Sequence, residues 1–286
     1  MDLFNKDEVK AEWLHPTKFP SMKGRDVVAI DLETCDYDLK KMGPGWARRA
    51  GMVIGIAISS GDFTAYYPIA HEGGGNMDSG PVLKYIKEVC EDESIQKVFH
   101  NAQYDIGWLS TIDIEVKGYI HDTMIAASLL NENRFSYALT SIGFEYLGER
   151  KNETLLKAKA SELGLDPKAE MYKLPAEFVG EYAEADALLT YKLHERFKSE
   201  LQRDSVETVY DIECRLIRVI FNMTKRGVRI DMDRAAGLKI KLRNKEKKYL
   251  KRIKDLVGED VQINAPRSVA KAFDQVNLEY PTTDLG

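Results

Sequence analysis

A short apolar run that ends in two acidic residues most constrains how this chain can fold. Residues 27–30 are Val-Val-Ala-Ile, and Asp31 and Glu33 follow them. Such a β-branched run is typical of a buried strand, in which residues two apart point to the same face. Carboxylates buried in this way are costly unless they are paired or bind a cation. The pattern therefore predicts a strand that presents two acidic ligands to one site.

The Asp-x-Glu spacing alone has little weight, because it occurs at residues 31–33, 113–115 and 211–213. The second copy alternates polar with apolar residues, which is typical of a strand with a solvated face. The third lies in a helical period, in which its two acids diverge. We interpret both of these copies as surface charge. The first copy, taken by itself, is equally compatible with a functional and a structural role.

Two further acids extend the pattern. Asp105 stands four residues after a short apolar strand, at the start of a predicted helix, where capping of that helix is an equally good interpretation. Tyr182 and Asp186 are four apart in a long predicted helix and therefore share one face. A burial of all four acids in one place would be too costly without cations. If they meet, the sequence predicts bound metal.

The order of predicted elements indicates an α/β fold. Strands are expected over residues 26–33, 52–60 and 63–70 as an antiparallel meander, with surface insertions at residues 43–46 and 73–75. Alternating strands and helices then favour parallel pairing. The expected later strands are residues 97–101 and 119–123, and the expected helices are residues 81–90, 104–110, 124–131, 136–147, 154–163 and 176–201. This mixed sheet flanked by helices is the arrangement of the ribonuclease H-like fold.

A second domain is expected after a change in composition near Arg203. Residues 204–226 and 232–257 have helical periodicity, so we predict domains over residues 1–203 and 204–286, the second containing a helical hairpin. The helix over residues 232–257 is crowded with lysine and arginine, including Lys245, Lys248 and Arg252. Two interpretations stay open for this basic surface, a grip on DNA phosphates and an ordinary solvated helix face.

Composition bounds the remaining possibilities. The chain has 286 residues, 44% of them hydrophobic and 30% charged, with a formal net charge of −5, which argues weakly against a nucleic-acid partner. Three cysteines without metal-type spacing and no secretory leader favour a reducing, cytoplasmic location. No apolar stretch approaches the roughly 20 residues that would cross a bilayer, so we expect no membrane insertion.

Taken in order, the motifs resemble a known family. Asp31-x-Glu33, Asn101-x-x-Tyr104-Asp105 and Tyr182-x-x-x-Asp186 resemble the three motifs of the DEDDy branch of 3′-to-5′ exonucleases. The related DEDDh branch uses a histidine near the tyrosine position, whereas here the nearest one, His194, follows the last acid.

The resemblance narrows to the proofreading domain of family A DNA polymerases, which are DNA polymerase I-like. Residues 121–124 and 131–134 fall between the second and third motifs as in that family, and residues 43–46, 71–74 and 173–175 resemble bacteriophage members. Residues 216–231 and 261–265 resemble the opening of the polymerase thumb. The resemblance implies that residues 1–203 are the exonuclease domain and that a phage-encoded chain would work in the host cytoplasm.

For the chemistry, the resemblance implies hydrolysis of phosphodiester bonds with two divalent cations about 3.5 to 4 Å apart. Oxygen ligands favour Mg²⁺ or Mn²⁺. By resemblance, Asp31 would bridge both ions, while Glu33 and Asp186 would complete the site of the ion that activates water. Asp105 would serve the ion at the departing 3′ oxygen, and Tyr182 would orient the water. Tyrosine is not expected to be the base, since its ordinary pKa is near 10.

The implied substrate is a single-stranded or frayed 3′ DNA end, released as nucleoside monophosphates. Asn101 and Arg134 match positions that contact the terminal nucleotide or its phosphate, and Tyr104 is a third candidate for binding nucleic acid. Tyr37 and Phe135 are candidates for stacking on bases, although we expect core packing for both.

Other interpretations stay open. Because the resemblance ends in the early thumb, we expect no polymerisation, and the chain would be either a fragment or the product of a split gene with a separate polymerase chain as partner. The alternatives to an active DNA exonuclease are a non-catalytic DNA-guiding module and an RNA-trimming enzyme of ribonuclease D type. The nuclease interpretation requires the four acids to meet, and a lysine that filled the pocket by ion pairing would contradict it.

Overall fold

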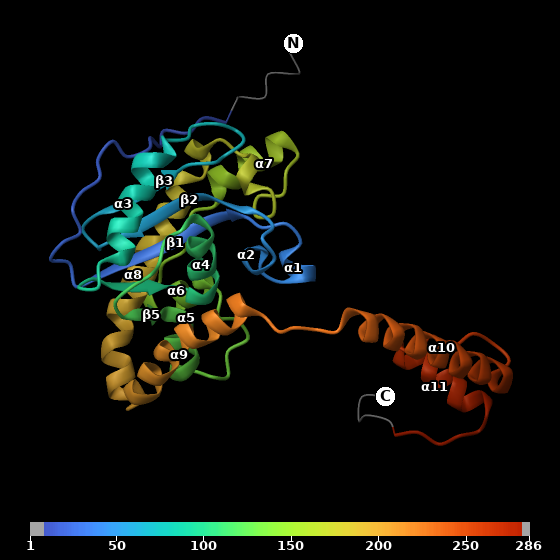
Figure 1. Ribbon diagram of the computed structural model, residues 1–286. Helices are drawn as coiled ribbons and strands as arrows, with labels where there is room; N and C mark the ends of the chain where they lie inside the picture. Colours follow the sequence, from blue (N-terminus) through green and yellow to red (C-terminus); the bar gives the residue numbers. More distant parts are fainter. Residues whose placement is uncertain (1–8, 282–286) are drawn as a thin grey trace, which may run out of the picture. The chain divides into compact units, whose positions relative to one another are not determined.

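The computed structural model describes residues 9–281. The chain divides into two compact units, Met1–Arg226 and Gly227–Gly286 (Figure 1). Each unit is described by itself below. None of the helices within the described residues combines the length and the apolar character that a membrane span requires.

The first unit is built on a mixed five-stranded sheet in the order β3-β2-β1-β4-β5. The antiparallel part consists of β1 (Val27–Cys35), β2 (Met52–Ser59) and β3 (Thr64–Pro68). The parallel part adds β4 (Gln96–Phe99) and β5 (Ile120–Asp122) beside β1. The predicted meander followed by parallel strands is confirmed.

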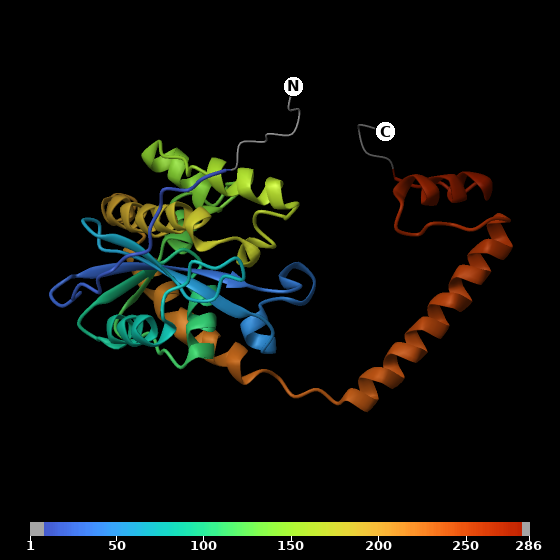
Figure 2. The ribbon, with the colours of Figure 1, turned by 90° about the horizontal axis from the view of Figure 1, so that it is seen from above.

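Helices cover both faces of this sheet. The long helix α8 (Gly180–Arg203) contacts β1, β2, β3 and β4 on one face. In Figure 2, α8 lies on one side of the sheet and α3 on the other. The remaining helices of this unit that are longer than one turn are α3 (Ser79–Glu91), α4 (Ala102–Leu109), α5 (Thr123–Leu130), α6 (Leu139–Leu147), α7 (Thr154–Leu163) and α9 (Glu207–Arg226).

The expected domain boundary at Arg203 differs from the division of the structure. Helix α9 packs against α4, α5 and β5 and buries Tyr210, Cys214 and Ile217, so it belongs to the first unit. Part of the apolar face of α9 therefore packs against the sheet domain. The second unit contains α10 (Met232–Val257) and α11 (Pro266–Gln275), and the sequence did not predict the latter.

The expectation that residues 43–46 form a surface insertion is wrong for Gly45 and Trp46, which are both buried. This connection contains the short helices α1 (Leu39–Met42) and α2 (Gly45–Arg48), and the indole of Trp46 is buried in the main core. A Cβ built on Gly107 of α4 would lie 2.2 Å from the Trp46 ring, so the absence of a side chain at Gly107 makes room for the indole. Because Trp46 follows turn-forming residues, the local sequence pattern did not indicate that it belongs to the core.

Candidate metal centre and active site

Strand β1 presents Asp31 and Glu33 to the face that α8 covers. The preceding residues of the same face, Val27 and Ala29, belong to a small core cluster against which Tyr191 of α8 packs. The alternation of the strand then brings Asp31 and Glu33 onto this face. Tyr182 and Asp186, one helical turn apart near the start of α8, approach from the opposite side.

Three carboxylates meet at this point. Asp31, Glu33 and Asp186 each offer an oxygen atom, and these atoms lie within 4.8 Å of one another. Burial, followed by the charge of Asp186, raises the pKa of Asp31 to about 7. Burial and the charges of Asp31 and Asp186 raise the pKa of Glu33 well above its ordinary value. Such mutual repulsion is the electrostatic condition that a bound cation relieves.

Asp105 lies beside this group rather than within it. Among residues 9–281, the set of carboxylate oxygens within 4.8 Å of one another consists of three members, without Asp105. Its Oδ1 accepts a hydrogen bond from the backbone N–H of Leu32, at 3.1 Å. Strand β4 pairs with β1 only as far as Ala29, so Asp105 accepts from an N–H beyond the end of that ladder. Burial and the charge of Asp31 raise the pKa of Asp105 well above its ordinary value.

The position of Asp105 is set by a buried aspartate that the sequence analysis did not select. Asp122, at the end of β5, accepts hydrogen bonds from the backbone N–H groups of Asn101 at 3.1 Å and Ala102 at 2.7 Å. It also caps α5 through Met124. Asn101 has a left-handed backbone, with φ of 73°, and α4 starts directly after it. In the sequence, the one sign of this positioning role was that Asp122 is an isolated acidic residue within the run 121–124.

Tyr182 faces the carboxylates. Its side chain is buried, and its hydroxyl oxygen lies 3.3 Å from the Nζ of Lys151. Burial and the charges of Asp186, Glu33 and Asp31 raise the pKa of Tyr182 far above 10. The hydroxyl therefore stays protonated, which agrees with an orienting group and argues against a base. By contrast, the His194 ring packs against the His121 ring, with 4.3 Å between their centroids.

A lysine does contact these carboxylates. A lysine that filled the site by ion pairing would contradict the nuclease interpretation, so its contacts are decisive. The Nζ of Lys151 lies 2.6 Å from Oδ1 and 2.7 Å from Oδ2 of Asp186. Within the described part of the chain, however, no ion pair is found at Asp31 or Glu33. The three carboxylates still converge, and the lysine pairs with only one of them, Asp186. Nothing in the charged run 149–153 distinguished Lys151 from surface charge.

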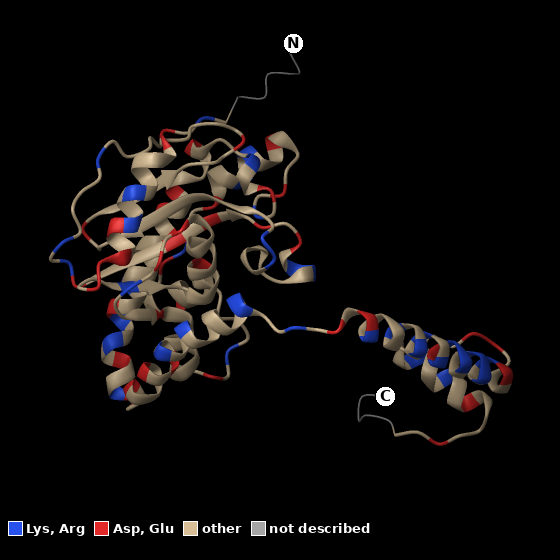
Figure 3. Cartoon of the chain, in the orientation of Figure 1, with Lys and Arg blue, Asp and Glu red and all other residues tan. Residues whose placement is uncertain are grey.

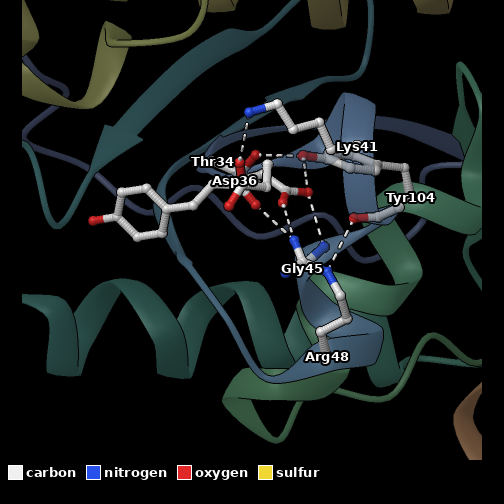
Figure 4. A network of polar contacts seen from close by, with 9 residues as sticks. Thr34, Asp36, Lys41, Gly45, Arg48 and Tyr104 are labelled. Carbon is white, nitrogen blue, oxygen red and sulfur yellow. Dashed lines mark hydrogen bonds and ion pairs between the residues drawn. The ribbon is translucent and has the colours of Figure 1, made fainter. Parts of the chain in front are cut away.

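Tyr104 is held in a polar network at the end of β1. Its hydroxyl lies 2.8 Å from Oγ1 of Thr34 and 3.0 Å from Oδ2 of Asp36. The same Asp36 accepts from the backbone N–H of Gly45 and pairs with Arg48, as Figure 4 shows. The network joins α4 to β1 and α2. Its bonds hold Tyr104 in a fixed orientation.

The other residues that we expect to bind DNA differ in how exposed their side chains are. The Arg134 guanidinium is buried, pairs with Glu145 and lies 5.5 Å from the centroid of the Tyr146 ring. Asn101 is exposed at the start of α4. Core packing was expected for Phe135 and Tyr37, but the Phe135 side chain is fully exposed and that of Tyr37 is 50% exposed.

The basic residues of the second unit lie on α10. Lys245, Lys248 and Arg252 are all exposed, and their spacing places them on one side of the helix. Figure 3 shows that basic residues predominate along α10. Asp231 caps this helix by accepting from the backbone N–H of Arg234, and Gly258 ends it.

Comparisons with known proteins show the family of this chain. Residues 16–202 match the family described as 3′-5′ exonuclease, of the DNA polymerase A type. The DNA-directed DNA polymerase of Pseudomonas phage M6 is 34% identical over 287 residues, covering 97% of this chain and 43% of that protein. The chain thus spans less than half of the length of this relative.

Solved structures share the fold. Brucella melitensis NrnC has a TM-score of 0.53 at 21% identity, covering 73% of this chain and 90% of that chain. The POL domain of Pol1 from M. smegmatis, in complex with DNA primer-template and dNTP, has a TM-score of 0.63 at 14% identity, covering 90% of this chain and 38% of that chain. With the family match and the converging carboxylates, the chain belongs to the 3′-5′ exonuclease family of family A DNA polymerases.

Proposed function

We propose that this chain removes nucleotides from the 3′ end of single-stranded or frayed DNA with the help of two divalent cations, Mg²⁺ or Mn²⁺. The observation that carries the proposal is the convergence of Asp31, Glu33 and Asp186 within 4.8 Å, next to Asp105 and Tyr182. Hard carboxylate oxygens without sulfur or imidazole ligands are the donor set that these cations prefer.

Each residue has a distinct role in this proposal. Asp31, Glu33 and Asp186 would hold the first cation, and Asp105 with Asp31 would hold the second. Bound cations would supply a nucleophilic water at neutral pH and stabilise the charge that develops on the phosphate oxygens. Tyr182, whose hydroxyl stays protonated, would orient that water by donating a hydrogen bond. Asp122 would act as a positioning residue, because it fixes the start of α4 and thereby Asp105.

The substrate would be held by groups around this centre. Asn101, Tyr104 and Arg134 would contact the terminal nucleotides, and exposed Phe135 offers a face for base stacking. Lys245, Lys248 and Arg252 on α10 would contact duplex phosphates. The products would be nucleoside monophosphates. In a polymerase of this family, the reaction would serve proofreading during replication, and the phage relative favours a host-cell cytoplasm as its location.

A labelled-strand assay tests the proposal. Single-stranded DNA and RNA, each labelled at the 5′ end, are incubated with Mg²⁺, Mn²⁺ or EDTA, and the products are resolved by length. We expect a ladder on DNA that requires a divalent cation and disappears in Asp31→Ala. Asp113→Ala, in the exposed Asp-x-Glu copy, is the matched control and should keep full activity.

The remaining outcomes separate the alternatives. A ladder on RNA alone would favour the RNA-trimming alternative over a proofreading role. Absence of cleavage with either cation, together with retained binding to DNA, would support the non-catalytic guiding module. Equal loss of activity in Asp31→Ala and Asp113→Ala would show that the assay reports stability and not the site.

A further inference from the structure

Lys151 places a positive charge directly on one of the three clustered carboxylates. The loop between α6 and α7 carries this residue, and both oxygens of Asp186 lie within 2.7 Å of its Nζ. Lys151 and Asp186 side chains are each only 7% exposed. A buried ion pair of this kind loses most of its hydration, so its partners are held by each other and not by water.

The ammonium group is also held from a second side. It lies 4.6 Å from the centroid of the Tyr182 ring and 3.3 Å from the Tyr182 hydroxyl. Tyr182 and Asp186 come from the same face of α8, so Lys151 contacts both functional groups that this helix contributes. Its charge also acts on Asp31 and Glu33, since it opposes the effects that raise the pKa of each.

We propose that Lys151 is the internal counter-cation of the metal-free site and that a divalent metal must displace it from Asp186. This inference rests on the proposed function, because it assumes that Asp186 is a metal ligand. Lys151 pairs with the carboxylate of Asp186. An oxygen atom of this same carboxylate lies within 4.8 Å of oxygen atoms of Asp31 and Glu33. An ammonium group and a divalent cation cannot both bind these oxygens closely, because like charges repel at such distances. Lys151 is thus a positioning residue that sets the metal concentration at which the site fills.

The test measures Mn²⁺ binding without DNA, by calorimetry and by the loss of the free-ion resonance signal. We expect Lys151→Met to lower the dissociation constant for Mn²⁺ by about tenfold, the size that one charged hydrogen-bonded contact produces. Lys151→Arg, which keeps the charge, should bind Mn²⁺ as weakly as the natural chain. In EDTA, Lys151→Met should also unfold at a lower temperature, because three carboxylates then lose their internal cation.

Lys159→Met is the matched control. Lys159 is a nearly buried lysine that pairs with Glu162 at 2.9 Å and lies 4.9 Å from the centroid of the Phe178 ring, without contact to the three carboxylates in any described interaction. It should change stability without changing Mn²⁺ affinity. If Lys151→Met is unfolded in EDTA, it can be folded with Mn²⁺ present, and the rate of metal release to a chelator then reports the affinity.

The outcomes separate this inference from the proposed function. Measurable Mn²⁺ binding that is equal in the natural chain and Lys151→Met, or weaker in Lys151→Met, would overturn the inference and leave the metal centre standing. Binding by neither chain would overturn both. Tighter binding in Lys151→Met, with the natural affinity in Lys151→Arg and Lys159→Met, would establish the exchange of the ammonium group for metal.

Discussion

The acid cluster predicts that one substitution raises stability while it removes activity. In Asp31→Asn, a neutral group of similar size replaces a carboxylate whose pKa is raised by burial and by the charge of Asp186. In the metal-free chain, the ionised form of Asp31 opposes folding, because it is desolvated and repelled by its neighbours. Asn lacks this repulsion and also lacks the ligand oxygen.

The magnitude follows from the pKa of Asp31. A rise from 3.8 to about 7 corresponds to an upper bound of about 4 kcal/mol at pH 8, at 1.36 kcal/mol for each pH unit. Asp31 is partly accessible to water and shares its repulsion with Glu33, so we expect about half of this, about 2 kcal/mol. For a unit of this size, the unfolding temperature in EDTA should rise by about 4 to 8 °C.

The pH dependence has a defined sign. Because the folded-state pKa of Asp31 is raised, its protonated form contributes stability that is complete below pH 3.8 and is lost as the pH rises through about 7. The advantage of Asp31→Asn should therefore shrink at pH 5.5 and be largest at pH 8. Divalent metal should stabilise the natural chain at pH 8 and leave Asp31→Asn nearly unchanged.

Tryptophan fluorescence can measure the unfolding temperature of the first unit. All three tryptophans, Trp13, Trp46 and Trp108, lie in this unit, which also contains the acid cluster. Asp113→Asn, at an exposed position with a left-handed backbone that asparagine tolerates, is the matched control and should leave the unfolding temperature unchanged. An Asp31→Asn chain that is less stable than the natural one in EDTA at pH 8, or that keeps cation-dependent cleavage, would refute the reasoning.

Three other predictions test separate parts of the structure. Gly107→Ala should destabilise the first unit by about 2 kcal/mol, because the added Cβ would meet the Trp46 ring. Gly237→Ala in α10, where no atom lies within 4 Å of the added Cβ, should not destabilise the chain. Thermal unfolding of the two variants measures this difference. Burial and mutual repulsion raise the pKa of Asp31 to about 7 and that of Glu33 well above its ordinary value, so Mn²⁺ binding must release protons from this site. The affinity for Mn²⁺ should fall by at least about tenfold for each pH unit below 7, as titration calorimetry will show. A flat profile from pH 5.5 to 8 would contradict this. Replacing the three exposed cations of α10 by alanine should weaken duplex binding and lower the dependence of log affinity on log salt by about 3, measured by fluorescence anisotropy, while an unchanged slope would favour a solvated helix face. The cations in question are Lys245, Lys248 and Arg252.

Local patterns were sufficient for the strands and for most of the acid site. The run 27–30 identified β1 because β-branched apolar residues favour a buried strand, and α7 was predicted with the bounds that the structure has. Spacing places Asp31 with Glu33, and Tyr182 with Asp186, on one face of a single element. The apolar run before Asp31 distinguished this Asp-x-Glu copy from the two at residues 113–115 and 211–213.

Only the tertiary structure decided relations between elements distant in the sequence. Whether Asp105 joins the three other acids depends on where β4 ends beside β1, and its carboxylate binds the Leu32 N–H there. The burial of Trp46 against Gly107 and the assignment of α9 to the first unit likewise depend on packing partners that no local period contains. Lys151 reaches Asp186 across 35 residues of sequence, and a charged loop residue carries no sign of its partner until the chain has folded. Local sequence patterns thus indicated the candidate ligands, and three-dimensional packing determined their neighbours.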